Sequence, residues 1–189
     1  MPAPNLHHLY PYVVPAGYVD WVEPGMWVDA PISDEVKVVL AFEEGSLVRN
    51  ALPSTLEYMG LNPEAAFDRA CDNLSKAFQA GHFELGLATL TDGIQVGIAR
   101  GSWMAPAGGL MVRNHYENLV EHFGVEQFAG IVLHQQMMVT FPVDERTVAS
   151  SMLRELVDEQ FTQHRKPISR SWLVIDGGWP RPYPGPRLF

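Results

Sequence analysis

The chain has 189 residues and a mass of 21.1 kDa; 47% of the residues are hydrophobic, 19% are charged, and the net charge is -9. A chain of this length buries about 70% of its unfolded surface, so a single domain needs no metal or disulfide, and the apolar content excludes disorder. The negative charge argues against nucleic acid and anionic membranes as partners, and it favours a protein partner with a basic or neutral surface.

Other features of the composition bear on where the protein works. Cys71 is the single cysteine, which excludes an internal disulfide framework. The start, MPAPNLHHLY, lacks the cationic and apolar parts of a secretory signal, and no run reaches the ~20 apolar residues that span a bilayer. We therefore expect a soluble, cytoplasmic protein with no membrane contact and no cofactor. The sequence leaves open whether it forms a homo-oligomer.

Proline and aromatic residues divide the predicted single domain into three parts. Residues 1–33 hold six prolines among tyrosines and tryptophans, which predicts an ordered arm of short strands laid on the core, residues 34–179. Residues 180–189 carry alternate prolines, and this spacing favours an extended, polyproline-like tail. We expect the tail to pack as a strap over the domain rather than to serve as an exposed hook for a partner.

Three hairpins and a closing strand are predicted from β-branched runs on either side of short turns. The turns lie at residues 43–46, at 91–93 and at 135–136, and the closing strand is SWLVID at 171–176. Asp92-Gly93, within the second turn, is a frequent hairpin signal because glycine and aspartate tolerate its backbone angles.

The first two helices are predicted from their capping residues. A short helix begins at the capping-box pattern of residues 54–57, where a serine oxygen binds a helix-end amide and a glutamate reaches back. A longer helix begins at Asn62, because asparagine caps well and Pro63 loses no hydrogen bond there, and it ends at Gly81. Its apolar spacing turns Cys71 toward the core, where a thiol is inert.

Two later helices complete the predicted order of elements. One carries the apolar residues of 112–123 and stops at Gly124, and a long one runs from Asp144 to a point before Pro167. The order is then ββ, αα, ββ, α, ββ, α, β. Because hairpins dominate, we predict an α+β fold: a mainly antiparallel sheet built from hairpins, with about three to four helices packed on it.

The stretch RGSWMAPAGGLMVRN, residues 100–114, joins a predicted strand to a predicted helix through small residues, as in loops that expose a nucleophile or bind phosphate. Ser102 lacks the second glycine of a Gly-x-Ser-x-Gly elbow, and no lysine follows Gly108 as a phosphate loop requires. We therefore interpret the stretch as a structural turn, in which Pro106 bends the chain and the paired glycines allow close approach of the backbone.

The seven histidines of the chain predict no metal or catalytic set. His115 and His122 share a helix face but lie two turns, about 10 Å, apart, whereas a zinc-binding helix has histidines four positions apart with a glutamate between them. Glu117 and Glu121 are expected to point elsewhere. We expect all seven histidines to be solvated or hydrogen-bonded.

Residues 45–179 carry the pattern of a known family. The pattern is a helix ending in Ala-x-x-Asn-Leu, a late hairpin, a further helix and a Leu/Ile-Ser strand. Its segments here are VRNALPSTLEYMGLNPEAAFDRACDNLSKAF, FAGIVLHQQMMVTFP, DERTVASSMLRELV and KPISRSWLVIDGGW, with matches at Ala70, Asn73, Leu74, Ile168 and Ser169. On these residues the chain resembles the YtpQ-like family of bacterial proteins, which has no assigned activity.

The resemblance implies a bacterial, intracellular α+β domain and supplies no catalytic residues. The chain departs from the family pattern in two places. Residues 101–106, Gly-Ser-Trp-Met-Ala-Pro, are an insertion before the middle helix, and LHQQMM replaces the Pro-Ser/Ala-Arg turn of the late hairpin.

Two hypotheses of function follow. The first is a non-catalytic protein-binding domain, such as an immunity or antitoxin-like protein that neutralises its partner. Because interfaces favour tryptophan, its candidate contacts are Trp21, Trp27, Trp103 and Trp179. The second is a small enzyme or small-ligand-binding domain with a pocket near residues 100–114 that uses Ser102, His115 and Glu84. The scattered polar side chains favour the first hypothesis and predict no catalytic residue and no metal ligand.

Overall fold

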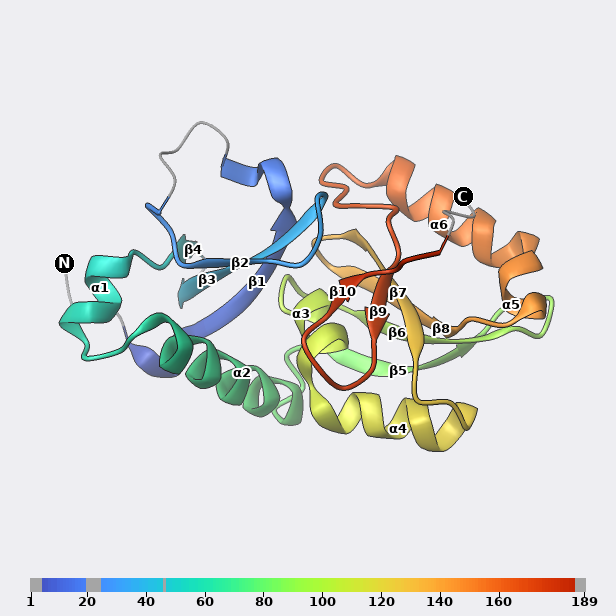
Figure 1. Cartoon of the computed structure of the whole chain (residues 1–189), viewed down its shortest axis with the longest axis horizontal. Helices are drawn as coiled ribbons and strands as arrows, with labels where there is room; N and C mark the ends of the chain where they lie inside the picture. The colour runs from blue at the N-terminus through green and yellow to red at the C-terminus, as the bar shows by residue number, and fades with distance from the viewer. Residues whose placement is uncertain (1–4, 20–24, 46, 186–189) are drawn as a thin grey trace.

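A computed structural model describes residues 5–19, 25–45 and 47–185 of the chain, so Trp21 lies outside the described residues. Within these ranges it contains six α-helices and ten strands, and every strand pair is antiparallel, which confirms the predicted α+β class. The strands form two sheets that lie side by side, one from the first quarter of the chain and one from the rest (Figure 1).

The first sheet is built around its longest strand. Its strands are β1 (Leu9–Pro15), β2 (Asp29–Pro31), β3 (Val36–Glu44) and β4 (Leu47–Asn50). Strand β1 pairs along one side of β3, while β2 and then β4 pair along the other, so the predicted hairpin of β3 and β4 is confirmed. β1 is longer than its proline content predicts, because an edge strand tolerates Pro11, whose missing N–H costs no ladder bond on the open side.

Helices α1 (Pro53–Tyr58) and α2 (Pro63–Gln79) cover one face of this sheet (Figure 1). The predicted capping box is wrong, because α1 begins one residue earlier, at a proline, and its N-cap residue Leu52 makes no side-chain bond. The predicted caps of the longer helix are confirmed. The Asn62 side chain accepts a 2.8 Å hydrogen bond from the Ala65 N–H, and Gly81 follows the helix with a positive φ of 78°.

Asn73 of α2 ties the helix to the start of the chain. Its side-chain Nδ2 donates to the Leu6 carbonyl at 2.7 Å and to the Leu9 carbonyl at 2.9 Å, and the residue is 3% exposed. We expect Asn73→Ala to lower the free energy of unfolding by about 2 kcal/mol, since it leaves two carbonyl groups without this donor. Urea unfolding measures the loss. The exposed Asn114→Ala serves as control, and equal stability of the two variants would contradict the prediction.

The second sheet has the strand order β10-β9-β7-β8-β6-β5. These strands are β5 (Glu84–Thr89), β6 (Gln95–Arg100), β7 (Phe128–His134), β8 (Met137–Pro142), β9 (Leu173–Ile175) and β10 (Arg181–Pro182). The predicted hairpins of β5 with β6 and of β7 with β8 are both confirmed. Every residue of β7 is buried, because helices cover both faces of the sheet at this strand.

The 100–114 stretch is not the turn predicted from sequence. It contains helix α3 (Ala105–Met111), in which every residue except Met111 is buried, followed at once by α4 (Arg113–Phe123). Helix α3 packs between strands β6 and β8 of the second sheet and β1 and α2 of the first half. The small residues of the stretch are therefore needed for close packing inside the molecule.

The long predicted helix after Asp144 is two helices, α5 (Glu145–Ala149) and α6 (Ser151–Gln163). The chain breaks at Ser150, whose hydroxyl accepts a 3.0 Å hydrogen bond from the Leu153 N–H and donates to Asp92 in the turn between β5 and β6. These two helices cover the face of the second sheet opposite α4, with Leu153 and Val157 in its core.

The end of the chain is placed against the sheet as far as Gly185. Strand β10 pairs with β9, and the Tyr183 ring lies 5.5 Å from that of Trp172, between ring centroids. The largest hydrophobic cluster contains residues of both sheets together with α2, α3 and α4, so the two halves share one core.

Candidate functional site

A groove of about 620 Å³ lies between helix α4 and strand β5. It is open to solvent along its length. The residues that line it are Leu85, Gly86, Leu87, His115, Asn118, Leu119, Glu121 and His122. The groove therefore combines a short apolar strand with a mostly polar helix face.

The polar wall of the groove is one face of helix α4, and helical spacing determines which residues form it. His115, Asn118, Leu119 and His122 are three, four and seven positions apart and so share one face of α4. Leu119 anchors this face, because it is 1% exposed and lies over Gly97, where an added Cβ would come within 2.8 Å of its Cδ2 atom. The absence of a side chain at Gly97 thus sets how closely α4 approaches the sheet.

His115 differs from what the sequence predicted, because it is neither solvated nor hydrogen-bonded through Nε2. The residue is 4% exposed, and its Nε2 atom is buried without a partner. Burial lowers the pKa of this imidazole to about 4, so His115 is neutral at pH 7. A neutral, buried ring at the base of the groove adds to its apolar character.

The other polar residues of the groove stand nearer the solvent. His122 shares a 2.9 Å hydrogen bond with the Gln95 side chain. Glu121 forms no ion pair with any described residue, and it faces the groove although the sequence interpretation placed it elsewhere. Neither lysine nor arginine lines the groove. Its electrostatic character is therefore set by one carboxylate on the helix.

The other wall of the groove is an edge strand. β5 is the last strand in the order of the second sheet, and within the described residues no strand pairs with its outer side. Leu87 in the middle of β5 is 47% exposed, and an added Cβ at Gly86 would meet no atom within 4 Å. The groove is thus continuous with an open strand edge.

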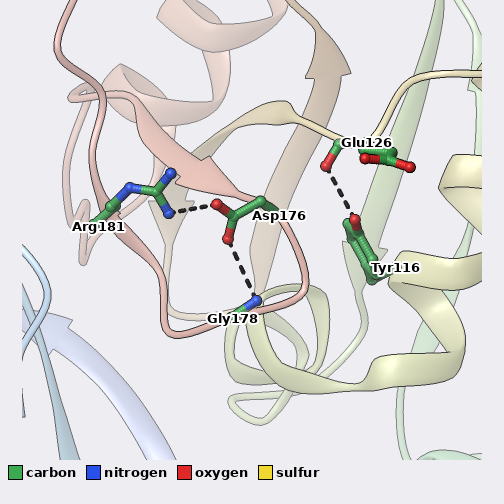
Figure 2. A network of polar contacts seen from close by, with 5 residues as sticks. All are labelled: Tyr116, Glu126, Asp176, Gly178 and Arg181. Atoms are coloured by element: carbon green, nitrogen blue, oxygen red, sulfur yellow. Dashed lines mark hydrogen bonds and ion pairs between the residues drawn. The ribbon is translucent and has the colours of Figure 1, made fainter.

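Tyr116 and the turn before β10 fix the opposite side of α4 (Figure 2). The Tyr116 hydroxyl donates to the Glu126 carbonyl at 3.0 Å, and its ring lies so close to Gly177 that an added Cβ would come within 2.8 Å. Asp176 accepts bonds from Arg181 at 2.6 Å and from the Gly178 N–H at 3.3 Å. The bond from Arg181 holds the pKa of the Asp176 carboxyl below its ordinary value. These contacts hold α4 in place as a wall of the groove.

The three residues of the pocket predicted near residues 100–114 are not brought together. His115 lines the groove, whereas Glu84 lines a second depression of about 340 Å³ along β5 that does not include His115, and it pairs there with Arg100 at 2.8 Å. Ser102 lines neither depression, and its hydroxyl accepts a 3.2 Å bond from the Met104 N–H at the start of α3. The stretch itself is mostly a buried helix.

None of the described tryptophans lines the groove. Trp103 is half-buried beside Tyr12, with 5.2 Å between ring centroids. Trp179 is 44% exposed, and its Nε1 donates to a backbone carbonyl at Pro31 at 3.4 Å. The Trp27 Nε1 is buried without a partner. Trp27, Trp103 and Trp179 therefore lie outside the groove lining, and Trp21 lies outside the described residues.

Cys71 and His134 are two further side chains that could react, and both lie outside the groove. Cys71 is only partly buried and not part of the core as predicted, but desolvation raises the pKa of its thiol to about 11, which makes it a poor nucleophile. His134 is 6% exposed and stacks on His164 with 3.7 Å between ring centroids, and its Nδ1 accepts a bond from the Gln136 N–H. In the described part of the chain, no three His, Cys, Asp or Glu side chains are placed to hold a metal ion.

The groove was missed from the sequence because its walls come from separate elements. The spacing of His115 and His122 on one helix face was visible, but the exposed edge of β5 depends on the strand order, which the sequence did not give.

Among the described helices, none is both long and apolar enough to cross a membrane. Comparisons with protein-family models, curated proteins and solved structures gave no match to the chain, so the YtpQ-like resemblance stays a prediction.

Proposed function

We propose that the chain is a non-catalytic protein-binding domain that binds its partner in the groove between α4 and β5. The observation that carries the proposal is the continuity of this groove with an unpaired strand edge at the exposed Leu87. Apolar surface beside free backbone groups favours contact with another polypeptide. The proposal retains the predicted bacterial, cytoplasmic setting, and an immunity-type neutralising role remains one form of it.

Electrostatics support the same choice of partner. The net charge of the chain is -9, and the groove holds the unpaired Glu121 carboxylate with no lysine or arginine in its lining. A basic or neutral partner avoids the repulsion that an acidic one would meet.

Selection of peptides tests this proposal without knowledge of the natural partner. Random peptides displayed on phage are selected against the immobilised full chain, and the selected peptides are then synthesised and titrated. We expect Glu121→Lys to weaken their binding by about tenfold or more, which corresponds to about 1.4 kcal/mol. The matched control, Glu159→Lys, makes the same charge change on the exposed face of α6 and is expected to leave binding within about twofold.

Two results would overturn the proposal. One is a selection that yields no binding peptide. The other is a set of peptides that bind the wild type and the Glu121→Lys variant equally, because such peptides use another surface.

A further inference from the structure

The hydrogen-bond register shows which backbone groups of β5 point away from the sheet. The Leu90 N–H, next to the end of β5, donates to the Ile94 carbonyl at 2.7 Å. In an antiparallel ladder the bonding residues alternate, so Ala88, Gly86 and Glu84 direct their backbone groups toward β6. The N–H and C=O groups of the residues between them, Leu85, Leu87 and Thr89, therefore point to the open side.

This edge carries few of the features that usually prevent strand pairing. Such features are proline, lysine, a bulge or a covering segment. The sequence of β5 is ELGLAT, with no proline and no lysine, and it pairs with β6 without a bulge. Its one charged residue, Glu84, is engaged by Arg100 of β6. The open side of β5 is therefore chemically ready to accept another strand.

The side chains of an added strand would meet two different environments. Leu87 pairs with Gly97, which lies against Leu119, so Leu85 and Leu87 are on the α4 side of the sheet. Residues of the added strand that point to this side enter the groove beside these leucines and the Glu121 carboxylate. On the other side, the space next to Gly86 is empty to 4 Å and can take a larger neighbour.

We propose that β5 accepts a seventh strand, an extended cationic segment of another protein in which apolar residues alternate with lysine or arginine. The apolar side chains fill the groove, and the cationic ones point to the opposite face of the sheet, where the net charge of -9 favours them. This inference rests on the proposed function and specifies how the partner is held. A second copy of the chain is disfavoured as the occupant, because it brings a further net charge of -9 to the same edge.

The probes are synthetic peptides of about ten residues, one alternating valine with lysine and one alternating valine with glutamate. At physiological salt, we expect the valine–lysine peptide to bind the full chain at least about tenfold more tightly than the valine–glutamate peptide. Leu87→Pro removes an outward N–H while leaving the bonds to β6, and it is expected to weaken binding by about tenfold or more. Leu87→Val keeps the N–H and is expected to stay within about threefold.

Amide hydrogen exchange on the wild type provides a readout that does not depend on the folding of a variant. The peptide is expected to slow exchange at the N–H groups of Leu85, Leu87 and Thr89. The N–H groups of Gly86 and Ala88 already bond to β6, so their exchange is expected to change less. This alternation along β5 is the signature of an added strand and would not arise from a peptide lying across α4 alone.

The outcomes separate this inference from the proposed function. Peptide binding that is weakened by Glu121→Lys but leaves the outward amides unprotected would overturn strand addition and leave groove binding in place. Failure of both the peptide selection and the valine–lysine titration would overturn both. Ultracentrifugation that shows a dimer, with Leu87 and Thr89 protected in the absence of peptide, would identify a second copy as the occupant and overturn the inference.

Discussion

Gly108→Val is expected to lower the free energy of unfolding by about 3 kcal/mol or more, the upper range for overpacking a core. Gly108 lies in the buried helix α3, and a Cβ at this position would fall between 2.2 and 3.1 Å from three ring atoms of Phe83. Phe83 is 3% exposed and packs on Phe78, so its ring can give way only by displacing buried neighbours. Thermal unfolding should show a midpoint lower by about 10 °C for a chain of this size.

The matched control is Gly86→Val in β5, where an added Cβ meets nothing within 4 Å and φ is ordinary. Its stability is expected to stay within about 0.5 kcal/mol of the wild type. If both variants unfolded at the same temperature, the close contact of α3 with Phe83 would be contradicted.

Acidification is expected to destabilise the protein through His115. The folded-state pKa is about 4, against about 6.5 for an exposed histidine, so the unfolded chain binds more protons between these values. The contribution of neutral His115 to the free energy of unfolding is fully present above about pH 6.5 and is lost as the pH falls toward 4. At about 1.4 kcal/mol for each pH unit, the loss amounts to about 3 kcal/mol.

His115→Leu removes the titrating group while keeping an apolar side chain, and it is expected to remove about 3 kcal/mol of this acid-side loss. Urea unfolding at a series of pH values measures the difference. Some pH dependence should remain, because burial and the neighbouring His164 also lower the pKa of His134. An unchanged pH profile in the variant would show that His115 is not buried as a neutral group.

The fold class and the hairpins could be predicted because their signals are local. Asn62 and Asp92-Gly93 act within a few residues of themselves, and the structure confirms both. The 100–114 stretch could not be predicted in the same way. Alanine, glycine and proline in this stretch indicate a turn when only local signals are considered. In the structure the same residues form a buried helix, and their small side chains allow it to fit between the sheets and α2.

The candidate site depended on information that the sequence does not hold locally. His115 was identified as part of a helix face, but its burial follows from the position of α4 on the sheet. The exposure of Leu87 follows from β5 being the last strand in the order, and this order is set by pairings between distant segments. The sequence predicted single, scattered polar residues. It did not predict a groove whose main feature is the edge strand β5, with backbone N–H and C=O groups that no described strand pairs with.

The position of α3 also bears on how the molecule unfolds. Because this helix is enclosed by strands from both sheets and by α2, neither half can be removed without uncovering it. A fragment that begins at Glu84 would lose the cover supplied by β1 and α2 and should not fold alone. Heating the intact chain should accordingly produce a single cooperative transition, with both sheets melting together.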